Sequence, residues 1–284
     1  GNFESVTLPS FKEFDAREED DDVEEGVYEQ LEEKEASDTP FVAYCLPGER
    51  DLVINSVIFI NKALEFFLRE FGSFPFSLYA IAFVEDSLNK NSYDYSGLSL
   101  CSSRLLYNSD LIEPMIPSTE QFLDCLATQW SGINVVPQSF NEMWCTVGIA
   151  KYMSLQFIKV LMGSNEYRFR VKSRMNEIIE TDVGRKPLGF LFYRSPILTN
   201  DLDFLKLKSP IILYILDKRM TKTDKSFGLS RVLPKIFLQA MSGDLPNGTV
   251  STLHFQTVCE KVARHKLEPF FKQWVYGSGT PIFN

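Results

Sequence analysis

The sequence contains very little histidine and no cysteine motif. His254 and His265 are its only histidines, and both lie near the C-terminal end. A catalytic or metal site built on histidine is therefore excluded from most of the chain unless it borrows from that end. The five cysteines are an odd number without Cys-x-x-Cys spacing, which argues against a disulfide framework and is typical of a reducing compartment.

Long hydrophobic runs are also absent. No apolar stretch approaches the roughly 18–20 residues of a membrane helix, so we expect no membrane partner. The 284 residues are 44% hydrophobic and 24% charged, which is enough for one large or two small domains with buried cores. The start at Gly1-Asn2-Phe3-Glu4 is abrupt and typical of the end of a strand. We therefore expect the chain to be a piece of a longer protein.

Negative charge is concentrated in one segment. Lys12–Glu35 holds thirteen acidic and three basic residues, and this excess exceeds the net charge of −9 for the whole chain. Such a run is typical of a solvated, disordered insert, which we place at 12–38 between strands Phe3–Leu8 and Phe41–Cys45. The alternative is an acidic tail that docks on a basic partner or covers a basic face.

The clearest helical pattern lies between Ser118 and Tyr152. Ser118, with Gln121 three residues later, is typical of a helix N-cap, and Ser139 predicts a second helix start. Apolar residues then recur at helical spacing; they are Phe122, Leu123, Leu126, Ala127 and Trp130 in the first helix, and Met153, Phe157, Ile158, Val160 and Leu161 before Gly163 in the second. The pattern predicts a buried helix hairpin.

This hairpin resembles the central motif of the gluzincin zinc aminopeptidases. That motif reads His-Glu-x-x-His-Gln-Trp-x-Gly, and eighteen residues separate its second His from a Glu that opens Glu-Gly-x-Ala-x-Tyr. In the same register and without a gap, the chain keeps Gln129-Trp130, Gly132, Asn141, Trp144 and Gly148-x-Ala150-x-Tyr152.

The metal chemistry of the motif is missing. By the resemblance, Asp124 and Thr128 stand at the two His positions. Cys125 replaces the general base, and Val147 replaces the third zinc ligand. Residues four apart share a helix face, but a Thr hydroxyl does not ionise near neutral pH and a Val side chain has no donor atom. A single carboxylate does not hold zinc, so we expect neither metal nor cofactor.

The cysteines do not restore this site. Cys125 is about 100° around the helix from Asp124, and Cys145 is about 200° from Val147, so the spacing does not support a rebuilt metal pair. A nucleophilic Cys125 would need one of the two histidines as its base, and nothing in the spacing supports that pairing.

Two further family positions are changed. The Gly-x-Met-Glu-Asn loop, which clamps the substrate amine, aligns with Asn91–Tyr95, where Asp94 alone keeps a carboxylate. We expect a loop at Asn89–Asp94 between strands Phe76–Val84 and Leu98–Leu106. The Tyr that stabilises the oxyanion aligns with Lys206.

Basic residues are interleaved with an aromatic after a predicted cap at Ser164. They are Arg168, Arg170, Lys172 and Arg174, with Arg185-Lys186 in the next turn. Such a run is typical of contact with nucleic acid, which we expect through phosphates rather than base edges. However, Arg168 with Lys172 and Arg170 with Arg174 are i,i+4 pairs on opposite helix sides, which favours a solvated charged helix.

The resemblance spans nearly the whole chain apart from the acidic insert. It implies an α+β, thermolysin-like zinc-aminopeptidase catalytic-domain fold. We expect a small mixed α/β part over 1–117 and a helical part over 118–284, with an upstream β-domain and downstream helical repeats outside this piece. The other expected helices are Asp51–Phe71, Ile211–Met220, Ser230–Met241 and Ser251–His265.

A peptidase scaffold without ligands, base, clamp and oxyanion Tyr resembles the aminopeptidase-like TBP-associated factors of TFIID, here of fungal type. The resemblance implies a nuclear, non-catalytic scaffold that recognises promoters in RNA polymerase II transcription initiation. Implied partners are other TFIID subunits and core-promoter DNA near the initiator, contacted mainly through its backbone, with no small-molecule substrate. Two alternatives stay open: an inactive aminopeptidase paralogue that binds peptide ends, and an active peptidase that uses other chemistry.

Overall fold

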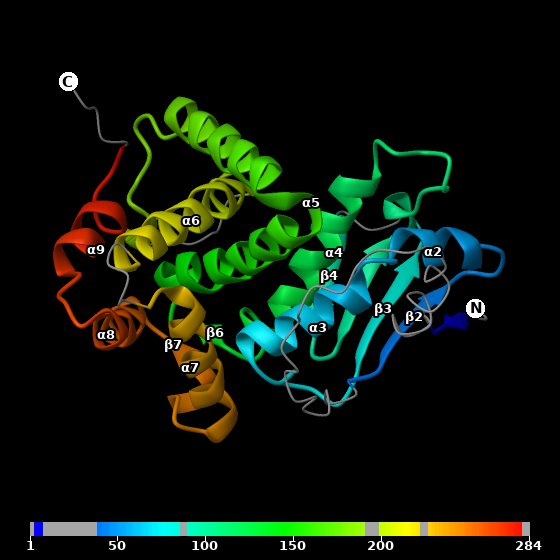
Figure 1. Cartoon of the computed structure of the whole chain (residues 1–284), viewed down its shortest axis with the longest axis horizontal. Helices are drawn as coiled ribbons and strands as arrows, with labels where there is room; N and C mark the ends of the chain where they lie inside the picture. The colour runs from blue at the N-terminus through cyan, green and yellow to red at the C-terminus, as the bar shows by residue number, and fades with distance from the viewer. Residues whose placement is uncertain (1–2, 8–38, 86–89, 191–198, 222–226, 280–284) are drawn as a thin grey trace, which may run out of the picture. The chain divides into compact units, whose positions relative to one another are not determined.

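The computed structural model describes residues 3–7, 39–85, 90–190, 199–221 and 227–279 (Figure 1). The predicted acidic insert at 12–38 lies outside the described residues. The chain forms two compact units. The first comprises Gly1–Arg69 and Phe76–Cys125, and the second comprises Glu70–Pro75 and Leu126–Asn284.

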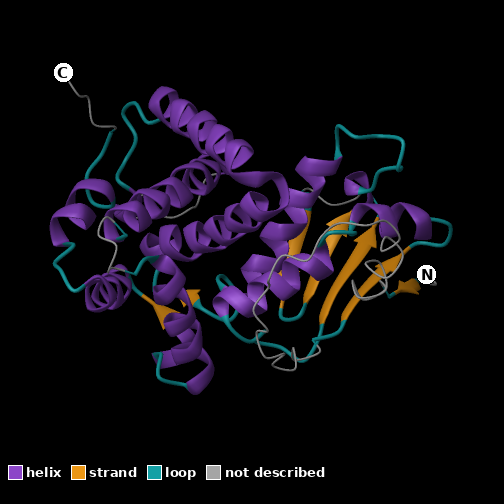
Figure 2. Cartoon of the chain, viewed as in Figure 1, coloured by secondary structure: helices purple, strands orange, loops and turns teal. Residues whose placement is uncertain are grey.

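The first unit is built on a mixed five-stranded sheet (Figure 2). In spatial order its strands are β1 (Glu4–Val6), β2 (Phe41–Cys45), β3 (Tyr79–Val84), β5 (Leu98–Ser102) and β4 (Ser92–Tyr95). The three central strands are parallel, and both edge strands are antiparallel to their neighbours. Alternating burial along β2 shows that one face of this strand is packed and the other is partly open.

The helix predicted over Asp51–Phe71 is wrong as a single element. It consists of α2 (Arg50–Ser56) and α3 (Ile60–Phe71), separated at 57–59. The Ser56 hydroxyl donates to the Leu52 carbonyl at 2.7 Å and accepts the Tyr107 N–H at 3.0 Å. A buried Ser that bonds both its own helix and a neighbouring loop favours a helix end at this point.

Helix α4 (Met115–Trp130) begins three residues before the predicted cap. The Ser118 N–H donates to the Pro114 carbonyl at 3.0 Å, so Ser118 lies inside the first turn and does not cap the helix. Pro117 is tolerated there because N–H groups of the first turn have no partner within the helix.

Helix α5 (Met143–Thr181) forms the centre of the second unit. A single turn of 3-10 helix, Phe140–Glu142, precedes it, with Ser139 at the N-cap position but without a side-chain cap bond. Gly163 has φ 83° and ψ 169°, and this non-helical residue divides α5 into arms 143–162 and 164–181. The predicted break at Gly163 is therefore confirmed, and the arms run in different directions (Figure 1).

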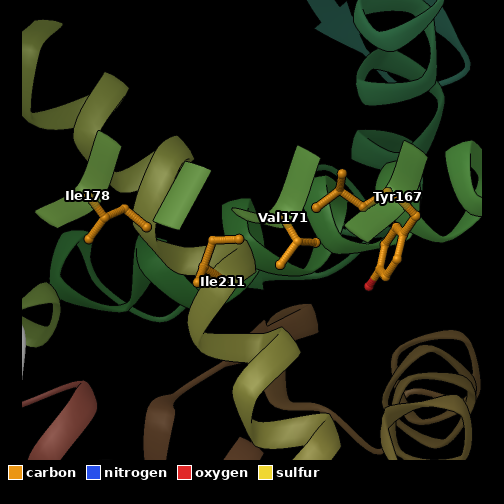
Figure 3. Close-up of a cluster of buried hydrophobic side chains, with 5 residues drawn as sticks. Tyr167, Val171, Ile178 and Ile211 are labelled. Atoms are coloured by element: carbon orange, nitrogen blue, oxygen red, sulfur yellow. The ribbon is translucent and has the colours of Figure 1, made fainter. Parts of the chain in front are cut away.

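The second arm of α5 packs against α6 (Thr199–Met220). Tyr167, Val171 and Ile178 lie on one side of the arm and form a buried cluster with Leu155 and Ile211 (Figure 3). The predicted start of α6 at Ile211 is wrong, because the helix continues through Pro210. Sequence patterns place a helix boundary before such a proline, although packing can hold the helix together across it.

Three shorter helices complete the second unit. They are α7 (Leu229–Ser242), α8 (Thr252–Ala263) and α9 (Glu268–Trp274), and β6 (Val136–Pro137) pairs in parallel with β7 (Thr249–Val250). The predicted helices Ser230–Met241 and Ser251–His265 correspond to α7 and α8, with Ser251 as the true N-cap of α8. Among the described helices, none is long and apolar enough to cross a membrane.

Trp144 links the start of α5 to α8. Its side chain is fully buried, and its Nε1 donates to the Thr252 hydroxyl at 2.8 Å. The Glu142 carboxylate accepts the Thr252 N–H at 2.8 Å and also the Thr252 hydroxyl, so it neutralises the positive end of α8. The indole packs edge-on against Phe255 and Phe271.

Trp130 has a similar role at the end of α4. It is fully buried, and its Nε1 donates to the Ser73 carbonyl at 3.1 Å. Phe74 packs edge-on against the indole, with ring centroids 5.0 Å apart. Both tryptophans are thus buried contacts with a satisfied N–H group.

Trp144→Ala should lower the free energy of unfolding by about 3–5 kcal/mol, because a buried aromatic is removed from contact with two other rings. Urea unfolding followed by circular dichroism measures the change. Phe169→Ala provides a matched control, since that ring is 66% exposed and should change stability little. Unfolding of Trp144→Ala at the urea concentration of the parent would contradict this structural role.

Candidate functional site

Helix α4 carries three of the four positions that hold catalytic groups in the zinc aminopeptidases. Asp124 and Thr128 are both partly buried and lie four residues apart on one face of the helix. Cys125 points elsewhere and is fully buried. The predicted arrangement on the helix is therefore present, with different chemistry.

The Cys125 thiol lies in a buried polar cluster of the first unit. The Gln121 amide donates to its sulfur at 3.9 Å and to the Ser92 hydroxyl at 2.9 Å. A hydrogen bond with Cys101 and burial together raise the pKa of Cys125 well above its ordinary value. The thiolate is the nucleophilic form of cysteine, so this environment opposes a nucleophilic role, which the spacing of the histidines also disfavours.

The predicted loop at Asn89–Asp94, which overlaps the aligned positions of the amine clamp at Asn91–Tyr95, is wrong from Ser92 onward. Residues 92–95 form strand β4, in which Asp94 is paired with Ser99 of β5. The Ser99 hydroxyl donates to the Asp94 carboxylate at 2.7 Å, and the Tyr79 and Ser99 hydroxyls are 3.1 Å apart. The one carboxylate retained from the clamp is therefore held in a hydrogen-bonded chain across three strands.

The second unit contains the fourth catalytic position, Val147, on the first arm of α5. Val147 is partly buried and has no metal-binding atom. The adjacent Gly148 explains why the motif persists here, because a Cβ at this position would lie 2.8 Å from the Ser209 Cβ of α6. A glycine lets α5 and α6 approach closely at this point.

Tyr152 also has a structural role. Its hydroxyl donates to Asp217, and burial together with this carboxylate raises the pKa of Tyr152 well above its ordinary value. The same Asp217 accepts the Leu229 N–H at 2.8 Å, at the start of α7. Tyr152 thus orients Asp217 of α6, whose carboxylate caps the start of α7.

The residues present do not fit zinc, which the fold family would imply. The four positions supply one carboxylate, one protonated thiol, one hydroxyl and one alkyl group, and structural or catalytic zinc sites need at least three nitrogen, sulfur or oxygen ligands from the protein. Among the described residues there is no group of three or more His, Cys, Asp or Glu side chains placed to hold a metal ion.

Lys206, at the oxyanion position of the sequence alignment, is exposed on α6. The neighbouring Lys208 is instead fully buried, and its Nζ donates to Asp182 at 2.7 Å. Its ammonium also lies 5.6 Å from the Phe204 ring centroid. No sequence pattern indicated this ion pair, because its two members are 26 positions apart.

The six basic candidates divide into three partly buried arginines and three exposed residues. Arg170 is paired with Glu166 at 2.8 Å. Arg185 lies 4.5 Å from the Phe204 ring centroid and donates to the Thr181 carbonyl at 2.9 Å. Arg174 is partly buried, whereas the remaining three candidates, Arg168, Lys172 and Lys186, are exposed.

No family model matches the chain. Curated relatives do match it, and they include two fungal proteins that are both described as transcription initiation factor TFIID subunit 2. The protein of Saccharomyces cerevisiae is 46% identical over 250 residues, which covers 86% of this chain and 18% of that protein. The protein of Schizosaccharomyces pombe is 38% identical over 283 residues, with 100% and 23% covered. The chain therefore spans about a fifth of these relatives.

Solved structures with a similar fold are zinc peptidases. An M1 zinc metallopeptidase of Deinococcus radiodurans has a TM-score of 0.62 at 14% identity, covering 99% of this chain and 54% of that chain. Native yeast LTA4 hydrolase has a TM-score of 0.67 at 14% identity, covering 86% and 39%. This likeness shows the fold, which is the α+β fold predicted from the sequence. The chain, with this fold and with its match to the two fungal proteins, belongs to the family of TFIID subunit 2, the aminopeptidase-like TBP-associated factors.

Proposed function

We propose that the chain is a non-catalytic part of the general transcription factor TFIID. It acts in the nucleus as a scaffold and promoter-recognition element in RNA polymerase II transcription initiation, with other TFIID subunits as partners. The observation that carries this proposal is the replacement of zinc ligands and base at Asp124, Cys125, Thr128 and Val147 in a chain whose relatives are TFIID subunits.

The structural roles of the retained motif residues support this proposal. Trp130 and Trp144 are buried with satisfied N–H groups, and Gly148 permits close helix packing. Tyr152 donates to a helix-capping carboxylate. Each of these residues therefore stabilises the fold without any catalytic task, as expected of a scaffold.

A second candidate function is a module that binds peptide ends. It is favoured by Asp94, the one carboxylate retained from the amine clamp. However, Asp94 already accepts a hydrogen bond from Ser99. Isothermal titration with a set of short peptides distinguishes the two functions, because a scaffold should give no heat that depends on a free peptide amine.

The full-length protein that carries this chain should co-purify with TBP and other TBP-associated factors. An affinity tag, mild salt and mass spectrometry of the eluate provide the measurement. A charge-neutral, unrelated nuclear bait controls for background. Recovery of the protein alone, under conditions in which other complexes from the same extract stay intact, would count against a place in TFIID.

Purified protein should contain no stoichiometric zinc and should not cleave aminoacyl substrates, because only one of the three ligand positions keeps a metal-binding carboxylate. Metal analysis by mass spectrometry and a fluorogenic aminopeptidase assay test both points. An active zinc aminopeptidase serves as the positive control in both. One zinc per chain, removable by a chelator together with cleavage, would overturn the non-catalytic assignment.

We further propose that the chain contacts the phosphate backbone of promoter DNA through the second arm of α5 and the following turn. The candidates are Arg168, Arg170, Lys172, Arg174, Arg185 and Lys186. Arg168 and Lys172 are exposed on one side of the arm, so they are best placed for such a contact. Arg170, already paired with Glu166, contributes less.

We expect Arg168→Ala with Lys172→Ala to make the slope of log affinity for duplex DNA against log salt less negative by about 1.8. Each phosphate contact contributes about −0.9 to this slope. Arg170→Ala with Arg174→Ala removes the same charge and should have a smaller effect. Deletion of Lys12–Glu35 should strengthen binding, since a competing polyanion is removed. Fluorescence anisotropy at several salt concentrations measures all three. Undiminished binding by the deleted form after all four substitutions would place the contact elsewhere.

A further inference from the structure

The turn between α8 and α9 forms a second basic surface, outside the six candidates on α5 and its following turn. Lys261, Arg264, His265 and Lys266 lie within six residues, and all four are exposed. No acidic residue occurs between Lys261 and Leu267. This group, which we call the basic turn, belongs wholly to the second unit.

The backbone of the turn gives no reason for an arginine at position 264. Arg264 has φ 58° and closes α8 by donating its N–H to the Glu260 carbonyl at 2.8 Å. This left-handed conformation at a helix end is usually taken by Gly or Asn, because other side chains are strained there. A large cation in this place therefore needs an explanation other than the geometry of the turn.

The nearest acid in sequence is directed inward. Glu260 accepts the Leu267 N–H at 2.9 Å and the Gln256 amide at 3.0 Å, and its side chain is only 15% exposed. These two hydrogen bonds lower the pKa of Glu260 to about 2. Lys266 pairs with Glu260 at 3.0 Å yet remains 86% exposed. Within the described part of the chain, neither Lys261 nor Arg264 pairs with an acid.

The apolar residues around the basic turn all face the core. They are Val262, Ala263, Leu267, Phe270 and Phe271, each at most 9% exposed. Protein partners are usually anchored by apolar or aromatic side chains, whereas a surface on which four basic residues outnumber one exposed acid, Glu268 at the start of α9, suits a chain of phosphates. The helix dipole favours cations at the C-terminal end of α8, at Lys261 and the C-cap Arg264, but does not account for Lys266 beyond it.

We propose that the basic turn contacts the phosphate backbone of duplex DNA through Lys261, Arg264, His265 and Lys266. This inference rests on the proposed function, because it supplies a further contact to the same promoter DNA. It adds a second surface on α8–α9 to the one on α5. Contacts of this kind fix position on the duplex and carry no base preference.

The test compares three charge-matched triple variants of the full-length protein on one duplex. The first is Lys261→Gln, Arg264→Asn and Lys266→Gln, in which Asn suits the left-handed backbone. The second is Arg168→Gln, Lys172→Gln and Lys186→Gln. The control is Lys90→Gln, Arg219→Gln and Lys235→Gln, three exposed cations outside both surfaces. A fourth variant, Lys261→Arg, Arg264→Lys and Lys266→Arg, keeps the charge of the basic turn.

In the first variant, the slope of log affinity for duplex DNA against log salt should be less negative by about 1.8 to 2.7, because two to three phosphate contacts are lost. The control and the charge-keeping variant should match the parent. Parent-like DNA binding by a folded first variant would overturn this inference while the proposed function stands. Failure of the parent to bind duplex DNA would remove the proposed DNA contact itself. If the first variant no longer co-purified with one TFIID subunit but bound DNA as the parent does, the inference would also be overturned. The basic turn would then be assigned to contact with an acidic protein surface.

Discussion

The close approach of α5 and α6 at Gly148 determines how the helices of the second unit pack together. A Cβ at this position would meet Ser209, so any larger residue would push the helices apart. On the far side of the break at Gly163, the second arm of α5 packs Tyr167, Val171 and Ile178 against the same helix. Helix α6 therefore contacts both arms of α5, and the direction of the second arm depends on the break between them.

Packing contacts explain why part of a peptidase motif is present beside positions where the zinc ligands and the base are replaced. Metal ligands and the base act through their donor atoms, so their replacement by Thr128 or Val147 removes little packing. Trp144 is different, because it fills the space between α5, α8 and α9 and its N–H is bonded to Thr252. Losing such a residue would leave a cavity and remove the N–H group that donates to the Thr252 hydroxyl. Stability therefore retains the framework while the catalytic residues are free to change.

The elements that were predicted well from the sequence are those fixed by local rules. Ser251 caps α8 and Gly163 breaks α5 because capping and a positive φ depend on a few neighbouring residues. The errors arise where distant contacts decide. Ser56 ends α2 by bonding Tyr107, and Ser92–Tyr95 becomes a strand by pairing with β5. At the candidate site, the identities at Asp124 and Thr128 followed from motif spacing alone, whereas the Lys208–Asp182 pair required the fold.

The direction of the acidic side chains also explains how a chain of net charge −9 can present positive surfaces. In the helical unit several carboxylates accept hydrogen bonds within the structure. Glu142 bonds the start of α8, Asp217 bonds the start of α7, and Asp182 is buried against Lys208. The field of each carboxylate is partly offset by the N–H or ammonium groups that donate to it. Exposed cations such as Arg168 and Arg264 have no such partner among the described residues, so no bonded carboxylate offsets their charge. Net charge is therefore a poor guide to which partners such a surface attracts, because the arrangement of donors around each acid decides the local sign.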